Sequence, residues 1–173
     1  TVAASADISG ADSLWQTRFL SIGFGANGAV DVADGGRVAT TNNLIVGETS
    51  TGKLNINAGG MVDAGMNAYV GRTGGVTGEV TVGGTGATWN VGDAAYLGGD
   101  NVAPGGSGSL TIGMQGVVNI ANTLKTWVGG TATINGVVNA ASVLNLGRLE
   151  GSGTINADVF NANGGIVEPG NSP

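Results

Sequence analysis

Short segments in which apolar and polar residues alternate recur along the chain. Alternation with a period of two is the pattern of a β-strand with one buried face. No stripe with the 3.6-residue period of a helix is present. The clearest copies are Val30-Asp31-Val32, Leu54-Asn55-Ile56, Val80-Thr81-Val82 and Leu110-Thr111-Ile112, with weaker copies at Ala132-Thr133-Ile134 and Gly153-Thr154-Ile155. The pattern therefore predicts many short strands.

Two further elements repeat together with the first. One is an aliphatic-x-aliphatic-Gly unit whose closing glycines, Gly23 to Gly147, are 24, 24, 27, 31 and 18 residues apart. Its copies are Leu20-Ser21-Ile22-Gly23, Leu44-Ile45-Val46-Gly47, Ala68-Tyr69-Val70-Gly71, Ala95-Tyr96-Leu97-Gly98, Thr126-Trp127-Val128-Gly129 and Leu144-Asn145-Leu146-Gly147. The other is a Gly-Gly-x-Val segment, as at Gly35-Gly36-Arg37-Val38 and Gly59-Gly60-Met61-Val62.

Three short strands every ~24 residues predict a solenoid, since none of them can bury a core alone and stacking aligns equivalent positions. We predict an all-β, right-handed parallel β-helix with three strands per coil and about seven coils of ~24 residues, the hand being the one favoured for parallel crossovers. Residues 1–173 would form a single domain. The apolar core would consist of two inward columns: Val30, Leu54, Val80 and Leu110, and Val32, Ile56, Val82 and Ile112.

The glycines mark the predicted corners between strands. At Gly35-Gly36 and Gly59-Gly60 we expect positive φ angles or close backbone approach. Asn42, Asn43 and Asn67 also fall at corners, where asparagine tolerates left-handed φ and can stack into ladders. Residues 98–108 exceed the repeat length and predict a protruding loop. Trp15 and Trp89, 74 residues apart, share a position near Val38 and Val62, which favours packing in the core or at a corner.

Composition narrows the classes of function. Of the 173 residues 35 are glycine, only 10% are charged, and both cysteine and histidine are absent. Disulfides, thiolate metal sites and histidine-based catalysis are therefore excluded. The net charge of −6 disfavours nucleic-acid binding. No apolar run is long enough for a membrane-spanning helix. We expect no enzyme and no cofactor.

One outward column is unusually apolar. The middle residues of the aliphatic-x-aliphatic-Gly units should point outward, and they read Ser21, Ile45, Tyr69, Tyr96, Trp127 and Asn145. Ile45, Tyr69, Tyr96 and Trp127 would form an exposed stripe, which is uncommon without a partner. We predict either that a loop or stacking within the chain covers this stripe, or that it is a lateral contact with another solenoid or with a glycan.

Several segments resemble repeats associated with type V secretion autotransporters and PEP-CTERM surface proteins. The resemblance lies in residues 78–90, Ala-Tyr-Leu-Gly at 95–98, Gly-Ser-Leu-Thr-Ile at 108–112 and the C-terminal segment 151–173, which ends in Pro-Gly-Asn-Ser-Pro. It implies a β-solenoid passenger region that is exported to the bacterial surface or the extracellular space, structural or adhesive, and without catalytic residues. We expect the chain to be a fragment or a processed piece.

The resulting hypothesis is a non-enzymatic surface solenoid: an adhesin, a stalk or a matrix scaffold. Self-association is the expected interaction, lateral or end to end, with glycans or a host surface as further candidate partners. The alternative is a subunit of a head-to-tail extracellular filament, because open strand edges invite pairing. The third choice is a β-helix that binds or degrades polysaccharide.

Catalytic and metal chemistry have weak sequence signals. The outward column Asp31, Asn55, Thr81, Thr111, Thr133, Thr154 contains one carboxylate, whereas glycoside cleavage needs a converging pair. Asp7 with Asp12 and Asp31 with Asp34 are candidate pairs, for which corner solvation is the simpler interpretation. Gly98-Gly99-Asp100-Asn101 is a fragment of a calcium-binding repeat. A mixed threonine column does not make the flat double array expected of an ice-binding surface.

Overall fold

The computed structural model describes residues 3–170, and this part of the chain is all-β, with twenty strands in two sheets. Every pairing between these strands is parallel, as the short alternating segments predict, and no helix is present among the described residues. The described part of the chain thus has no helix that could cross a membrane. The architecture is a repeat of stacked parallel strands, as a β-solenoid requires.

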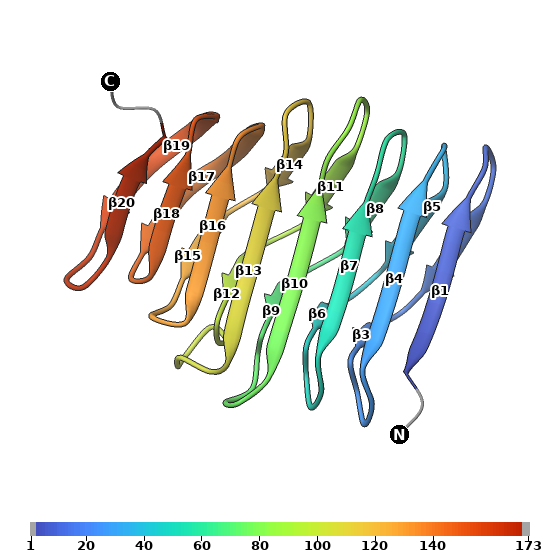
Figure 1. The fold of residues 1–173 in the computed structure, drawn as a ribbon, viewed down its shortest axis with the longest axis horizontal. Coiled ribbons are helices and arrows are strands. Elements are labelled where there is room, and N and C mark those ends of the chain that lie inside the picture. The colour runs from blue at the N-terminus through green and yellow to red at the C-terminus, as the bar shows by residue number, and fades with distance from the viewer. Residues whose placement is uncertain (1–2, 171–173) are drawn as a thin grey trace.

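One sheet contains eight strands that lie side by side along the whole molecule (Figure 1). We call this sheet the first wall. Its strands, in order, are β1 (Ala4–Ser9), β4 (Gly28–Ala33), β7 (Gly52–Ile56), β10 (Thr77–Val82), β13 (Ser107–Ile112), β16 (Gly130–Ile134), β18 (Arg148–Gly151) and β20 (Ile166–Pro169). No two neighbouring strands of the first wall follow each other directly in the sequence, because the chain passes through the two other walls before it returns.

The twelve-stranded sheet supplies those two walls. The second wall contains β2 (Leu14–Thr17), β5 (Arg37–Thr40), β8 (Met61–Ala64), β11 (Thr88–Val91) and β14 (Val117–Ile120). The third wall contains β3 (Leu20–Ile22), β6 (Leu44–Val46), β9 (Ala68–Val70), β12 (Ala95–Leu97) and β15 (Thr123–Thr126). The two walls join at β17 (Val137–Asn145), whose first part pairs with β14 and whose last part pairs with β15. The neighbouring β19 (Thr154–Asn161) follows β17 around the same corner.

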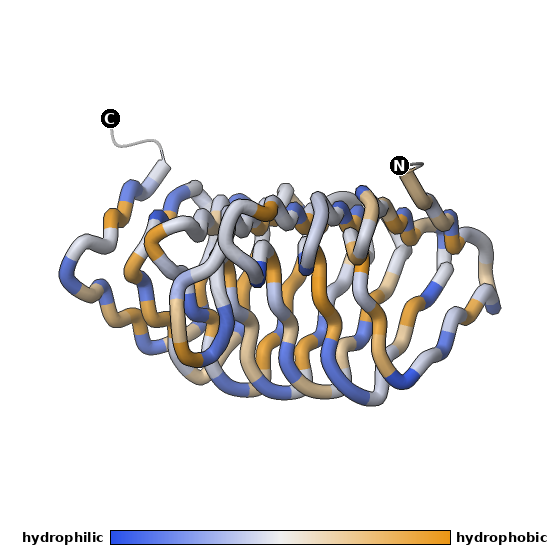
Figure 2. The backbone as a smooth tube through the Cα atoms, turned by 90° about the horizontal axis from the view of Figure 1, so that it is seen from below, coloured by the Kyte–Doolittle hydropathy of each residue, from blue (hydrophilic) through white to orange (hydrophobic). Residues whose placement is uncertain are grey.

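The length of one circuit, which we call a coil, varies along the stack. Residues that are hydrogen-bonded across neighbouring coils are 24 apart at Asp31 and Asn55. The separation rises to 30 at Thr85 and Gln115 and falls to 16 at Asn145 and Asn161. The strands keep their register while the corners change length, apart from a shift between Asn139 and Ser142 in the pairing of β17 with β19. The two ends of the described chain lie at opposite ends of the stack (Figure 2).

The core lies between the three walls and consists of the predicted inward columns. All eight predicted residues are at most 4% exposed and align in register through β4, β7, β10 and β13. Val38, Val62 and Trp89 form another inward column on the second wall, and Trp89 is fully buried. Trp15 pairs with Val38 and packs partly against this core. Both tryptophans therefore have the packing role that the sequence predicts.

Glycine is required at one corner of each of the first four coils, where the third wall turns into the first. Gly71 has a φ of +67°, and a Cβ atom there would lie 2.1 Å from the carbonyl oxygen of Ser107 in the next coil. Gly23, Gly47 and Gly98 repeat this arrangement. An L side chain disfavours such a φ, and the stacked backbone leaves no space for it.

The glycines predicted at the corner between the first and second walls meet the same two demands. Gly35 and Gly59 have φ angles of +87° and +74°, and a Cβ atom on Gly36 or Gly60 would lie 2.1 or 2.3 Å from a carbonyl oxygen of the preceding coil, so the predicted role of these glycines is confirmed.

The corner asparagines behave differently from the prediction in one respect. The non-glycine residues with positive φ among those described are Asp12, Asp34 and Gln115, and none is an asparagine. Asn43 and Asn67 act instead as acceptors that join coils: Asn43 Oδ1 accepts from the Asn67 N–H at 3.1 Å, and Asn67 Oδ1 from the Ala94 N–H at 3.3 Å. The expected ladder is present, and the expected left-handed backbone is not.

The alignment of the outward column of the first wall is wrong near the C-terminus. Thr133 on the first wall pairs with Glu150, whereas Thr154 lies on the second wall beside Val137. The outward column therefore ends in carboxylates, Glu150 and Glu168. The error arises because the last coils are short, so that Leu149-Glu150-Gly151 occupies the place assigned to Gly153-Thr154-Ile155.

Candidate interaction surfaces

The predicted apolar stripe exists over part of its length on the third wall. Ser21, Ile45, Tyr69 and Tyr96 stack in register through β3, β6, β9 and β12. The next two positions of the column are Lys125 and Leu144. Trp127 and Asn145 therefore do not belong to it, which corrects the sequence alignment. The structure brings Ile45, Tyr69 and Tyr96 together and places Trp127 beyond the strand.

Groups of the chain itself cover most of this stripe. Ile45 has no exposed surface and Tyr69 is 7% exposed. The rings of Tyr69 and Tyr96 stack with centroids 5.3 Å apart, and the Arg72 guanidinium lies 5.1 Å from the centre of the Tyr69 ring. Burial raises the pKa of both tyrosines above the ordinary value. These contacts favour internal packing as the role of Ile45 and Tyr69, and they leave Tyr96 partly accessible.

Trp127 anchors the loop that follows β12. Its indole N–H donates to the carbonyl oxygen of Asp100 at 2.7 Å, and Lys125 Nζ lies 3.5 Å from the centre of its ring. The Asp100 carboxylate accepts hydrogen bonds from the N–H groups of Ala103 and Val102, at 2.9 and 2.8 Å, which lower its pKa. The expected insertion at 98–108 is thus a folded loop, closed by a bridge between Gly99 and Pro104, and its last two residues begin β13.

A polar chain replaces the aliphatic core at the C-terminal end of the third wall. The inward position that Leu97 occupies in β12 is taken by Thr126, Asn145 and Asn161 in the following coils. Thr126 and Asn145 have no exposed surface. The Thr126 hydroxyl donates to Asn145 Oδ1, and Asn145 Nδ2 donates to Asn161 Oδ1 at 2.7 Å and to the carbonyl oxygen of Ile166 at 2.9 Å. The network joins successive coils and supplies partners for the buried Thr126 and Asn145, and it ends at the exposed Asn161.

A second polar column, on the outside of the second wall, was not recognised in the sequence. Asn90, Asn119, Asn139 and Asn156 each donate from Nδ2 to the side-chain oxygen of the residue one coil before, at 2.7 to 2.9 Å, beginning with Asp63. We call these five residues the amide ladder. The available signal was an Asn after an inward apolar residue in each second-wall segment from β11 onward, as in Trp89-Asn90-Val91. Arg37 extends the ladder through an ion pair with Asp63 of 2.6 Å.

The amide ladder borders a shallow open hollow of about 530 Å³. Asn90, Asn119 and Asn139 each use one N–H and one oxygen lone pair within the ladder, so a second N–H and a second lone pair remain available on each. These groups repeat at the spacing of neighbouring parallel strands, ~4.8 Å. The lining residues are Arg37, Asp63, Ala64, Asn90, Val91, Gly92, Asn119, Ile120, Ala121 and Asn139. The surface is suited to an extended, hydroxyl-rich and uncharged ligand.

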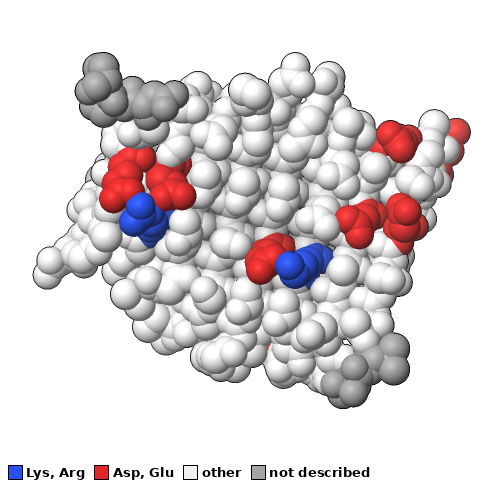
Figure 3. All heavy atoms as spheres, in the orientation of Figure 1, with Lys and Arg blue, Asp and Glu red and all other residues white. Residues whose placement is uncertain are grey.

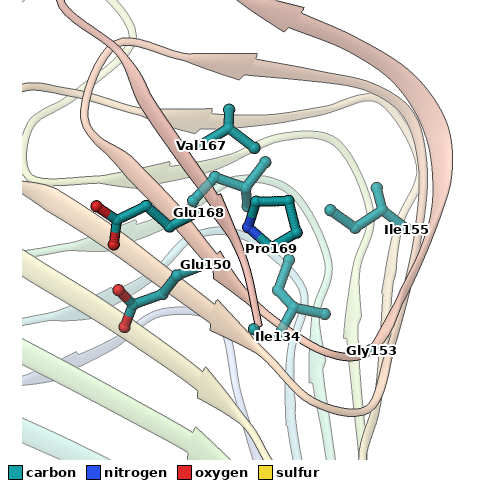
Figure 4. A pocket seen from close by; sticks show the side chains of 9 residues that line it. Ile134, Glu150, Gly153, Ile155, Val167, Glu168 and Pro169 are labelled. Carbon is teal, nitrogen blue, oxygen red and sulfur yellow. The ribbon is translucent and has the colours of Figure 1, made fainter. Parts of the chain in front are cut away.

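The two ends of the stack are apolar and hollowed. A hollow of about 240 Å³ lies at the C-terminal end, where Ile134, Ile155 and Val167 line it (Figure 4). A second hollow, of about 250 Å³, lies at the N-terminal end and is lined by Trp15, Leu20 and Phe24, among others. Large exposed apolar side chains gather at these ends: Leu14, Phe19 and Phe24 at one, and Val159, Phe160, Ile166 and Val167 at the other.

Glu150 and Glu168 both line the C-terminal hollow and face each other in register on β18 and β20. Both carboxylates point to the same side, away from the apolar lining (Figure 4). Arg148 forms ion pairs with both. Its hydrogen bond, followed by one from Thr133, lowers the pKa of Glu150. A general acid at neutral pH needs the opposite shift, so the arrangement is suited to holding the edge strand β20 against β18.

Charged groups are sparse on the first wall. Figure 3 shows a mostly uncharged face with one pair of opposite charges near the middle and small groups toward the ends. Lys53 and Glu79 form an ion pair of 2.7 Å on β7 and β10. Among residues 3–170, no group of three or more Asp and Glu side chains is placed to hold a metal ion. Asp100, the candidate calcium ligand, therefore belongs to no such group.

Comparison of the chain with protein-family models, with curated proteins and with solved structures gives no match. The resemblance to autotransporter and PEP-CTERM repeats therefore remains an inference from the sequence.

Proposed function

We propose that the chain is a right-handed, three-walled β-solenoid of about seven coils that serves as a structural scaffold on the bacterial surface or outside the cell. The observation that carries the proposal is the continuity of the stack. Backbone pairing runs through all three walls. Two side-chain networks also join successive coils: the amide ladder, and the hydrogen bonds that link Thr126, Asn145 and Asn161. Such a body is an extended support in which each coil contacts only its neighbours.

The proposed location and lack of catalysis rest on the sequence. The acidic, cysteine-free composition and the resemblance to exported passenger regions favour an adhesin, a stalk or a matrix scaffold. The paired Glu150 and Glu168 are the groups to test for catalysis, because they line one hollow.

The test combines shape and activity of the purified chain. We expect negative-stain images of elongated particles and no release of reducing ends or unsaturated products from neutral and acidic polysaccharides. An antibody against the folded chain should label the surface of the producing bacterium. Polysaccharide cleavage that is lost in Glu150→Gln and retained in Asp158→Asn would overturn the proposal.

A head-to-tail filament is the second candidate, and the exposed apolar ends favour it. Val167 lies in the inward column of the first wall at one end of the stack, and Ala6 lies in it at the other. A second copy that continued the column would place Val167 beside Ala6. The same register would bring Glu168 beside Asp7, since these residues belong to the outward column. We therefore expect assembly to be favoured by salt, which screens like charges.

Matched variants distinguish assembly through the ends of the stack from nonspecific aggregation. Val167→Asp should abolish any filaments of the purified chain. Val102→Asp, at an equally apolar but distant loop position that is 78% exposed, should leave them intact. A chain that stays monomeric at high concentration and high salt would contradict this candidate.

Polysaccharide binding is the third candidate, favoured by the hollow beside the amide ladder. Asn119 is its central residue, since it donates to Asn90 and accepts from Asn139. Co-sedimentation with insoluble neutral β-linked polysaccharides should be lost in Asn119→Leu and retained in Thr111→Val on the first wall. Equal binding by both variants would contradict a role for the ladder.

A further inference from the structure

Three Asn-Gly dipeptides occur in the chain, and the structure gives them different surroundings. They are Asn27-Gly28, Asn135-Gly136 and Asn163-Gly164. In this dipeptide the glycine amide nitrogen has no neighbouring Cβ atom to shield it from the asparagine side chain. We propose that Asn163 is a site of spontaneous deamidation, and that the fold protects Asn27 and Asn135 from the same reaction. This proposal is independent of the functions proposed above.

The reaction needs only the chain and water. The backbone nitrogen of Gly164 loses its proton and attacks Cγ of Asn163. The new N–Cγ bond forms, the Cγ–Nδ2 bond breaks, and the amide group takes up a proton and leaves as ammonia. One water molecule then opens the five-membered imide at either carbonyl. The products are aspartate, with the original main chain, and isoaspartate, in which the main chain runs through the side chain.

Asn27 and Asn135 are held on both reacting groups. Asn27 Oδ1 accepts from the Thr51 N–H at 3.2 Å, and the Gly28 N–H donates to the Thr51 carbonyl at 2.9 Å. Asn135 Oδ1 accepts from the Ser152 N–H at 3.1 Å, and the Gly136 N–H donates to the Ile112 carbonyl at 3.1 Å. The side chain and the nucleophile must therefore each lose a partner before attack.

Packing adds a second barrier at these two dipeptides. A Cβ atom on Gly28 would lie 2.8 Å from the backbone nitrogen of Gly23, and one on Gly136 would lie 2.3 Å from the carbonyl oxygen of Gly116. A planar imide ring needs space that the stacked neighbouring backbone occupies.

Asn163 and Gly164 have none of these restraints. Both are exposed at the centre of the turn between β19 and β20, which is closed by the Gly165 N–H donating to the Ala162 carbonyl at 2.9 Å. Within residues 3–170, neither the Asn163 side chain nor the Gly164 N–H has a hydrogen-bond partner. A Cβ atom at Gly164 would meet nothing within 4 Å. Rotation into the attack geometry therefore disturbs one turn and no packed contact.

The modification would act on the last coil. Asn161 Nδ2 donates to the Gly165 carbonyl at 2.9 Å, and Asn161 accepts from the buried Asn145. Isoaspartate at 163 adds one main-chain carbon and a negative charge to this turn. We expect β20 to exchange its amide hydrogens faster, while β7 and β10 are unchanged.

The experiment ages the purified folded chain in mildly alkaline buffer and follows each dipeptide by peptide mapping and by isoaspartyl methyltransferase labelling. We expect the Asn163 peptide to convert at least about tenfold faster than the other two, because their reacting groups are hydrogen-bonded. In concentrated urea the three rates should become similar. Asn163→Gln should remove the fast product and leave the other two peptides unaffected.

Two outcomes would overturn the proposal. One is equal conversion of the three dipeptides in the folded chain. The other is faster conversion at Asn27 or Asn135 than at Asn163. An Asn163→Asp variant carries the charge without the extra carbon, so faster exchange in β20 only in the aged wild-type chain would assign the loosening to isoaspartate.

Discussion

Gly71 provides the sharpest test of how the corners hold the stack together. Replacing Gly71 by alanine puts a methyl group on a residue with a φ of +67° and 2.1 Å from the carbonyl oxygen of Ser107. The neighbouring chain offers two controls. Gly75 has a similar φ of +78° with nothing within 4 Å, and Gly74 is equally open without a positive φ. The three alanine variants therefore separate backbone conformation from close approach.

The expected magnitudes follow from these differences. Left-handed φ costs an L residue about 1–2 kcal/mol, which is the whole expected effect at Gly75. Gly71→Ala adds the displacement of a stacked backbone, about 1–3 kcal/mol by analogy with overpacked cores, for a total of about 2–5 kcal/mol. Gly74→Ala restricts only the unfolded chain and should stabilise by up to about 1 kcal/mol.

Urea unfolding followed by circular dichroism measures these changes, with the slope of the transition compared between variants to confirm that the unfolded state is the same. The predicted order of stability is Gly74→Ala, then Gly75→Ala, then Gly71→Ala. A Gly71→Ala variant that loses no more stability than Gly75→Ala would refute the argument from close approach.

Three further predictions concern side chains. Asn145→Ala should lower the free energy of unfolding by about 2–4 kcal/mol, because it removes the hydrogen-bond partner of the buried Thr126 hydroxyl and of the Ile166 carbonyl. Asn156→Ala, at the exposed end of the amide ladder, should cost less than about 1 kcal/mol. Denaturant unfolding compares the two variants. Trp89→Phe should lower the free energy of unfolding by less than about 2 kcal/mol, well below the usual cost of truncating a buried tryptophan to alanine. The reason is that the buried Trp89 indole N–H has no hydrogen-bond partner among the described residues to lose. An equal loss of stability in Trp89→Phe and Trp89→Ala would contradict this. Acidification should loosen the loop at Asp100: hydrogen bonds lower the pKa of its carboxyl in the fold, so its stabilisation is present above about pH 4 and is lost as the pH falls through the lowered value. Asp100→Asn should flatten the pH dependence of unfolding below about pH 4, and an unchanged slope would count against the assignment.

The sequence predicted the parallel strands, the inward columns and the corner glycines because these repeat in the first coils with nearly constant spacing. Prediction failed where the spacing changed. The Thr126-Trp127-Val128-Gly129 segment fits the motif of earlier coils, but Val128 is 79% exposed, and the strand lies two residues earlier. In the same way, Leu149 was overlooked as an inward residue because the following glycines imitate a weaker repeat.

The surfaces were harder to predict than the core. An outward stripe of Ile45 and Tyr69 follows correctly from alternation, but the cover supplied by Arg72 depends on how a corner folds back. The amide ladder needs the register of five coils whose lengths differ, so no fixed period aligns Asn90 with Asn119 and Asn139. The burial of Asn145 does not follow from its polar side chain, because it depends on hydrogen-bond partners from two other coils.

The uneven coil length has a mechanical consequence. Each strand of a wall is hydrogen-bonded only to the strands before and after it, so force applied to one end would peel the stack one coil at a time. Each released coil would lengthen the chain by about 3.4 Å per residue, or roughly 80 Å for a coil of 24 residues and roughly 60 Å for one of 17. Pulled from the C-terminus, the molecule would therefore yield in short steps first and in longer steps afterwards.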